Sequence, residues 1–254
     1  MSVQLAWDNI DDFQPRRKKG KNRKQSRQTQ QSRNIFDTFG VIEPKTINQT
    51  KVFKHFDEGY NLYLHGTAGT GKTFVSLYLA LDELYNSRYT NTVTIVRSAV
   101  SSRDIGHLPG SKKEKEAEFE APYSQICQEL FGRADAYSIL REKGYINFVS
   151  TSHIRGITLR DTIVIVDEVQ NMNEGELHTI ITRVGENSKI IFCGDTKQDD
   201  LKYLGKDKSG LRNFSNILSH MESFKKIEFN QDDIVRSGIV KEFILACIKN
   251  EHLS

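Results

Sequence analysis

The stretch GTAGTGKT, residues 66–73, has the residue types and the spacing of a phosphate-binding loop. Its glycines, followed by Lys and Thr, satisfy every position of the pattern GxxxxGK[ST]. Glycines let consecutive N–H groups point into one concavity, and the start of a helix adds partial positive charge there. We therefore expect Lys72 to reach the β- and γ-phosphates of a nucleotide and the Thr73 hydroxyl to bind Mg²⁺. The predicted phosphate-binding residues are Gly66, Thr67, Ala68, Gly69, Thr70, Gly71, Lys72 and Thr73.

The residues on both sides of this loop predict the strand and the helix that it must connect. Leu62, Tyr63 and Leu64 form a short apolar run of the kind found in buried strands. Residues 75–84 are largely apolar and indicate a helix. The motif requires the order strand, glycine-rich turn and helix, which disfavours the alternative of a turn that matches by chance.

A second candidate site follows the continuous β-branched run at residues 163–166, which is typical of a central strand buried on both faces. Because such a strand delivers its C-terminal residues to the ligand crevice of an α/β sheet, we expect Asp167 to hold Mg²⁺. Glu168 would orient and deprotonate an attacking water. In the alternative interpretation, the acidic pair ends the strand and caps the next helix. Asn173, with Glu176 three residues later, fits that capping role better.

A third strand and turn, KIIFCGDTKQDDL at residues 189–201, repeats this design. Gly194 allows a sharp turn that would direct Asp195 and Gln198 to the same crevice. A neutral amide such as Gln198 can donate to a γ-phosphate or to the attacking water, so it would distinguish ATP from ADP. The motif is weak alone, because Gly-Asp turns are common, but its place after the other two makes it specific.

Length and composition bound the remaining possibilities. The chain has 254 residues, of which 37% are hydrophobic and 27% charged, as expected for one sizeable core with appendages. Cys127, Cys193 and Cys247 lie far apart, which predicts neither a zinc site nor a disulfide framework and fits the cytoplasm. No apolar run approaches the roughly 20 residues that span a bilayer, so we expect no membrane segment.

The positive charge is concentrated at the N-terminus. Residues 1–33 carry nine basic and three acidic side chains, a net charge of +6, which leaves −3 for the other 221 residues. The segment is also polar and lacks periodicity, so we predict a disordered arm over residues 1–34 and a folded domain over residues 35–254. Such an arm would bind a nucleic-acid backbone, or it is a solvating tail with no specific partner.

Taken together, the motifs GTAGTGKT, DEVQN and GDTKQ resemble the DExQ pattern of superfamily 1 helicases. The surrounding stretches narrow the resemblance to the PhoH-like ATPases of bacteria and tailed phages, over roughly residues 42–250. These stretches are KTINQ (45–49), VRSAV and GHLPG (96–110), RGITLRD (155–161), TRVGENSK (182–189), SGL (209–211) and DIVRS (233–237).

The resemblance implies roles for four further residues. Gln49 would recognise the adenine edge, and Arg236 would contact phosphate as a sensor or arginine finger. Arg97 and Arg155 would face nucleic acid. The alternative for Gln49 is a surface glutamine, and for the arginines surface ion pairs. His65, Thr67, His107 and Asp199 depart from the family pattern, and so does the basic arm, but none of them alters the phosphate chemistry.

A helicase that acts as a monomer needs two RecA-like domains, and only 56 residues follow Gln198. A second domain of this type requires roughly 100 to 150 residues. We therefore expect a homo-oligomeric ring, such as a hexamer, in which a neighbour covers the nucleotide.

The sequence thus predicts an α/β fold: a single RecA-like P-loop domain with a mostly parallel central sheet flanked by helices. The expected cofactors are ATP and Mg²⁺, and the expected activity is nucleic-acid-dependent ATP hydrolysis with helicase-like action on single-stranded RNA or DNA. Lys72, Asp167, Glu168, Gln198 and Arg236 would carry it. The alternative is an ATP-operated switch or assembly factor that acts on protein partners.

Overall fold

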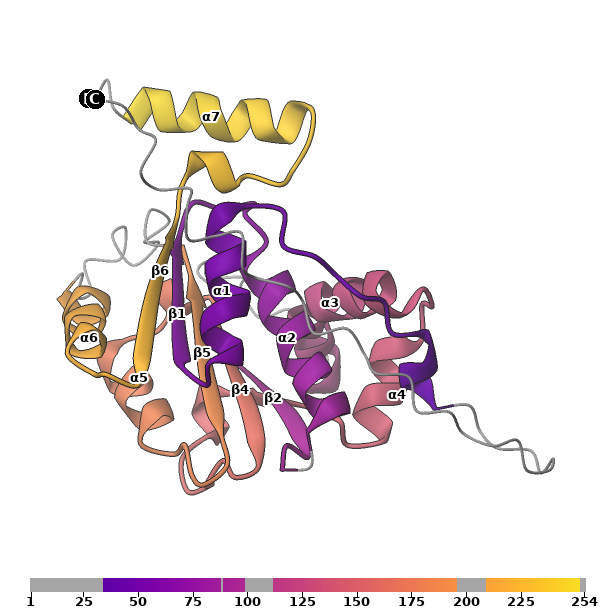
Figure 1. Cartoon of the computed structure of the whole chain (residues 1–254). Helices are drawn as coiled ribbons and strands as arrows, with labels where there is room; N and C mark the ends of the chain where they lie inside the picture. Colours follow the sequence, from indigo (N-terminus) through magenta and orange to yellow (C-terminus); the bar gives the residue numbers. More distant parts are fainter. Residues whose placement is uncertain (1–33, 88, 99–111, 196–208, 252–254) are drawn as a thin grey trace.

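The computed structural model describes residues 34–87, 89–98, 112–195 and 209–251, which form a layered α/β structure (Figure 1). Its centre is a six-stranded sheet in the order β3-β2-β4-β5-β1-β6, and each neighbouring pair is parallel. The expected α/β fold with a mostly parallel sheet is confirmed. The strands are β1 (Asn61–Gly66), β2 (Thr92–Arg97), β3 (Ile146–Ser150), β4 (Thr162–Asp167), β5 (Lys189–Gly194) and β6 (Phe224–Phe229).

Helices cover both faces of this sheet, and each face has its own apolar core. Side chains alternate along a strand, so Leu64 of β1 points to one core and Tyr63 to the other. The larger core contains side chains of α1 to α4 and of η2, and the smaller one those of α5 and α6. The α-helices are α1 (Ile47–Asp57), α2 (Lys72–Asn86), α3 (Lys112–Phe131), α4 (Ala136–Glu142), α5 (Glu174–Ile181), α6 (Ser209–Ser219) and α7 (Ile239–Glu251). The 3₁₀ turns are η2 (Ile35–Thr38), η3 (Thr151–His153), η4 (Val169–Asn171) and η6 (Gln231–Asp233).

The expected elements lie close to their predicted positions. Every residue of β4 is buried, as the β-branched run at 163–166 predicts. Asn173 caps α5 in a capping box with Glu176, also as expected. The last helix begins at Ile239, because Gly238 has φ 60° and belongs to the turn before it.

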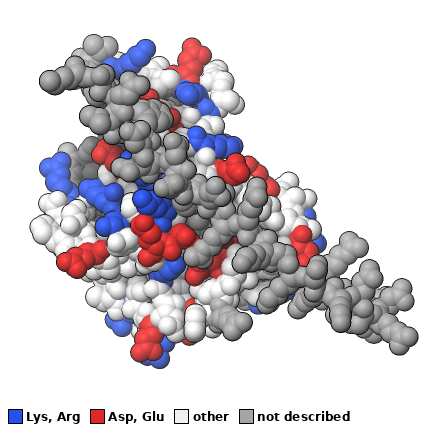
Figure 2. Space-filling model, in the orientation of Figure 1, with Lys and Arg blue, Asp and Glu red and all other residues white. Residues whose placement is uncertain are grey.

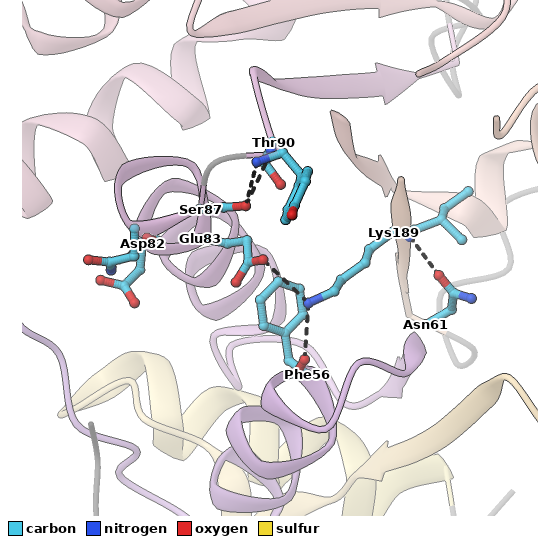
Figure 3. A network of polar contacts seen from close by, with 10 residues as sticks. Phe56, Asn61, Asp82, Glu83, Ser87, Thr90 and Lys189 are labelled. Atoms are coloured by element: carbon cyan, nitrogen blue, oxygen red, sulfur yellow. Dashed lines mark hydrogen bonds and ion pairs between the residues drawn. The ribbon is translucent and has the colours of Figure 1, made fainter. Parts of the chain in front are cut away.

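A polar network surrounds Lys189, the first residue of β5, at the end of the sheet where the strands begin (Figure 3). Its Nζ lies 3.7 Å from Glu83 Oε1 of α2 and donates to the Phe56 carbonyl of α1 at 3.4 Å. Beside it, Asn61 Oδ1 accepts from the Ile190 N–H at 2.9 Å. The start of β5 is thereby held against β1, α1 and α2.

Among the described residues, no helix is both long and apolar enough to cross a membrane.

Candidate nucleotide-binding site

The predicted phosphate loop joins β1 to α2 and has the backbone conformation that its glycines permit. Gly66, Gly69 and Gly71 have φ of 112°, 72° and 81°, in the left-handed region that side chains disfavour. At Gly66 there is also no room, since an added Cβ would lie 2.1 Å from the Phe229 carbonyl oxygen of β6. The Thr67 N–H donates to the same carbonyl at 2.9 Å, so the loop is seated against β6.

Lys72 is the first residue of α2, and its ammonium group lies inside the loop. Nζ donates to the carbonyl oxygens of Gly66 at 3.0 Å and Thr67 at 2.7 Å. Burial lowers the pKa of Lys72, an effect that the nearby carboxylates, Asp195 first, oppose. The side chain is thus held by loop carbonyls beside the start of α2, where an anion would gain from both the ammonium and the helix N-terminus.

Thr73 and Asp167 meet, although they are 94 residues apart. The Thr73 hydroxyl donates to Asp167 Oδ1 at 2.9 Å, because the start of α2 lies beside the end of β4. Mg²⁺ suits this pair, since it is usually held by one or two protein oxygens together with substrate phosphates. Within the described ranges, no group of three or more His, Cys, Asp or Glu is placed to hold a metal by itself. A divalent ion held by this pair would take its further ligands from water or from a nucleotide.

Glu168 follows Asp167 in a left-handed backbone conformation, with φ 55° and ψ 46°. Such a conformation is uncommon outside glycine and is concentrated at functional sites. Burial, and then the charge of Asp167, raise the pKa of Glu168 above that of an ordinary carboxyl. Gln170 donates from Nε2 to Glu168 Oε2, and its Oε1 accepts the Asp195 N–H at 3.0 Å. Gln170 thereby connects the end of β4 to the residue that follows β5.

A cavity of about 540 Å³ opens over the loop and contains most of the predicted site. Gln49 lines it and is buried, with Oε1 accepting from the Lys45 N–H at 2.8 Å and Nε2 donating to the Thr70 carbonyl at 3.0 Å. The amide expected to read adenine therefore also links α1 to the phosphate loop. Ala68, Gly69, Thr70, Gly71, Lys72, Thr73, Asp167, Glu168 and Asp195 also line the cavity.

Two of the three predicted arginines lie at this cavity. Arg97, at the end of β2, donates to the Phe119 carbonyl of α3 at 3.3 Å, with its guanidinium 5.7 Å from the centre of the Phe119 ring. Arg236 packs against the phosphate loop from outside it: its Cγ would be 3.2 Å from a Cβ added at Gly69. Arg155 is exposed and is not part of the cavity lining.

Gln198 lies outside the described residues, as do the arm over residues 1–33 and the stretch GHLPG. On the face drawn in Figure 2, the Lys and Arg side chains of the described residues are interspersed with Asp and Glu side chains. The described part of this face that is visible in the view is therefore mixed in charge.

Sequence reasoning missed two residues of the site. Tyr123 is fully buried in α3, and its hydroxyl donates to Asp167 Oδ2 at 2.9 Å. Gln170 lies inside the DEVQN motif, yet no role followed from the sequence. The one available signal for Tyr123 was general: the hydroxyl of a buried tyrosine usually finds a polar partner.

This loop, lysine and pair of strand-end carboxylates, on a parallel sheet, define a P-loop domain. The family model described as PhoH-like protein matches residues 41–247, and the chain belongs to this family. A PhoH-like protein of Synechocystis is 32% identical over 214 residues, covering 84% of this chain and 64% of the relative. A PhoH-like protein of Bacillus subtilis is 33% identical over 206 residues, covering 81% and 63%. The chain thus spans slightly less than two thirds of these relatives.

A shorter match, to the protein PhoH2 of Bacillus subtilis, is 35% identical over 187 residues and covers 70% of this chain and 42% of that protein. Among solved structures, the large terminase of a thermophilic bacteriophage aligns with a TM-score of 0.43 and 14% identity. That alignment covers 79% of this chain and 49% of the terminase.

Proposed function

We propose that this protein binds ATP together with Mg²⁺ and hydrolyses it, with single-stranded RNA or DNA as the partner that stimulates hydrolysis. The observation that carries the proposal is the contact of Thr73 with Asp167 at the phosphate loop, with Glu168 next in the chain. These groups come from two separate motifs, and the fold brings them to one cavity. Gln49 at the same cavity supports adenine as the base.

Three side chains would bind the triphosphate and its ion. Lys72 has two carbonyl partners in the loop, and one of its donors would turn to the β- and γ-phosphates. Thr73 Oγ1 and Asp167 Oδ1 present adjacent oxygens on one side of the cavity. Mg²⁺, when bound there with the nucleotide, supplies positive charge against the charge that develops on the phosphates. The chain's own contribution is to hold these oxygens and the ammonium in fixed positions.

Glu168 is the proposed general base. A base in water attack must be a carboxylate that still has appreciable proton affinity, and the raised pKa of Glu168 moves it in that direction. The hydrogen bond from Gln170 holds one carboxylate oxygen, which leaves the other to accept a proton from water. Gln198 and Arg236 complete the proposed catalytic set, as the residues that contact the γ-phosphate or the attacking water.

Steady-state ATP hydrolysis with Mg²⁺, with and without single-stranded RNA and DNA, tests this proposal. Glu168→Gln keeps the size of the side chain and one accepting oxygen but removes the carboxylate that takes up the proton, so the rate should fall roughly 10²-fold or more. ATP binding should be unchanged. The matched control is Glu222→Gln, because Glu222 is exposed and lies outside the cavity lining. A Glu168→Gln variant that hydrolyses ATP at the wild-type rate would refute the assigned role.

The nucleic-acid partner is proposed from the charge distribution, since the N-terminal 33 residues carry a net charge of +6. Affinity for single strands should fall steeply between about 50 and 200 mM salt, because bound phosphates release counterions. Deletion of residues 1–33 should flatten this dependence. If the deleted protein binds with the same affinity and the same salt slope, the arm has no part in binding.

The alternative, an ATP-operated switch, is favoured by one contact. Gln170 bridges Glu168 and the Asp195 N–H, so a change at the hydrolysis site reaches the chain after β5 through two hydrogen bonds. Hydrolysis that single strands do not stimulate, in a protein that still binds ATP with Mg²⁺, would favour this function. Protein partners would then be the object of the search.

A homo-oligomer is proposed because α7 exposes apolar side chains beside the site. Ile239 and Phe243 are 81% and 68% exposed, and they lie one helical turn apart. Ile244 of the same helix lies against the phosphate loop, with its Cδ1 3.1 Å from the position of a Cβ added at Gly69. A neighbouring subunit that covers these residues would lie next to the nucleotide. Light scattering that gives a monomer mass both with and without a non-hydrolysable ATP analogue would exclude the oligomer.

A further inference from the structure

The carboxylate of Asp167 has a different partner on each oxygen. Oδ1 accepts from the Thr73 hydroxyl at 2.9 Å, on the side of the phosphate loop. Oδ2 accepts from the Tyr123 hydroxyl, also at 2.9 Å, on the side of α3. Two donors on opposite oxygens fix the rotation of the carboxylate about its Cβ–Cγ bond, which a single donor would leave free.

Tyr123 is suited to hold this oxygen because its position leaves the hydroxyl few alternatives. The side chain is 0% exposed, and its ring lies 6.2 Å from that of Phe148 in β3. A neutral phenol donates one hydrogen bond without adding charge, so it orients the carboxylate without competing with a cation for it. The arrangement matches the general pattern in which a metal-binding carboxylate is itself hydrogen-bonded by an outer group.

The helix that carries Tyr123, α3, has a second contact with the C-terminal ends of the strands, made by Arg97 of β2. Arg97 is the β2 partner of Asp167 in the strand register, and it contacts both the carbonyl and the ring of Phe119. Phe119 and Tyr123 are four residues apart and therefore share one face of α3. Two neighbouring strand ends, those of β2 and β4, are thus tied to one helix face.

We propose that Tyr123 is a positioning residue that orients Asp167 for the Mg²⁺ bound with the nucleotide. The inference rests on the proposed Mg²⁺–nucleotide binding and adds a residue outside the three motifs. Tyr123 does not touch the nucleotide in this role. It acts through Asp167. Removal of its hydroxyl should therefore weaken the binding of Mg²⁺ and leave the binding of the phosphates by the loop unchanged.

The test is Tyr123→Phe, which removes one oxygen and keeps the buried ring. Binding of a fluorescent N-methylanthraniloyl ATP is measured in EDTA and then as a function of Mg²⁺ concentration. In EDTA the variant should bind within about twofold of the wild type, because the phosphate loop is unchanged. The Mg²⁺ concentration that gives half of the metal-dependent gain in affinity should rise about tenfold or more, as for other outer-shell partners.

The matched control is Tyr137→Phe. Tyr137 is also buried, and its hydroxyl donates to the Glu120 carboxylate of α3 at 2.5 Å. It therefore loses the same kind of hydrogen bond to the same helix, away from Asp167. Urea unfolding of both variants shows whether they fold, and Tyr137→Phe should retain the wild-type Mg²⁺ dependence.

Three results overturn the inference in distinguishable ways. If Tyr123→Phe has the wild-type Mg²⁺ dependence while the wild type responds to Mg²⁺, the positioning role alone is wrong. If both tyrosine variants shift equally, the effect comes from helix stability. If wild-type nucleotide binding is indifferent to Mg²⁺, the proposed function fails first. In an Asp167→Asn background, Tyr123→Phe should change nothing further, since the two residues act as one unit.

Discussion

His65 offers a quantitative test of the packing around the phosphate loop. It lies on β1 one residue before the loop, is 6% exposed, and stacks on Tyr63 with ring centres 5.0 Å apart. Among the described residues, neither ring nitrogen has a hydrogen-bond partner. Burial, and then the positive charges of Lys226 and Lys72, lower the pKa of His65 from 6.5 to about 4.

This lowered pKa makes the stability of the protein depend on acid pH. The unfolded chain binds the proton more tightly than the folded one, so His65 has no effect above pH 6.5 and destabilises as pH falls toward 4. The difference between the two pKa values corresponds to a loss of about 3 kcal/mol in the free energy of unfolding, reached when the pH falls below both values. At about pH 5, the same two pKa values give about 2 kcal/mol.

The perturbation is His65→Leu, which removes the titrating ring and keeps a side chain of similar volume. Urea unfolding of both proteins is measured at about pH 7.5 and about pH 5. The wild type should lose about 2 kcal/mol more than the variant between these conditions, because all other groups are shared. His220→Leu is the control, since His220 is exposed on the chain after α6. If wild type and His65→Leu lose equal stability to within about 0.5 kcal/mol, the buried neutral histidine is refuted.

Two further substitutions test the local structure around the site. Gly194→Ala should destabilise by about 1 to 3 kcal/mol, because the added Cβ would lie 2.3 Å from Val169 Cγ2 and 3.0 Å from Gln170 Oε1. A urea unfolding midpoint equal to that of the wild type would contradict this close approach. Asn173→Ala should cost about 1 kcal/mol through loss of the capping box at α5, while the exposed Glu222→Gln should cost nothing measurable. Equal stability of these two variants would mean that the cap contributes little.

The parts of the site that could be predicted are those encoded locally. The glycine-rich loop, the lysine and the threonine are consecutive, and the periodicity on each side distinguishes the strand from the helix. The β-branched run before Asp167 predicts a buried strand, and every residue of β4 is buried. Asn173 and Glu176 are three residues apart, so the capping box is also a local pattern. Each of these requires only a short window of neighbouring residues.

The parts that could not be predicted depend on which distant residues meet. Tyr123 and Asp167 are 44 residues apart, and the sequence of α3 gives no sign that one of its buried tyrosines ends at a carboxylate. Gln170 has the same difficulty, because its partner beyond β4 is a backbone N–H at Asp195. The hydrogen bond from Gln49 Nε2 to the Thr70 carbonyl was equally invisible. These contacts depend on how strands and helices distant in the sequence are arranged in space. The periodicity of a short stretch of sequence carries no information about that arrangement.

These unpredicted contacts have one property in common: each attaches a phosphate-site motif to an element or residue beyond the motif's own chemistry. Gln49 of α1 holds the loop at Thr70, Tyr123 of α3 holds Asp167, and Gln170 joins Glu168 to the chain after β5. The residues that would contact phosphate and metal therefore determine what kind of ligand is bound, while Gln49, Tyr123 and Gln170 determine whether these groups are aligned. Substitution of one of these three supporting side chains should alter metal or nucleotide dependence while Lys72, Thr73, Asp167 and Glu168 all remain in place. Because each support is buried, such an effect would be transmitted through side-chain packing and not through solvent.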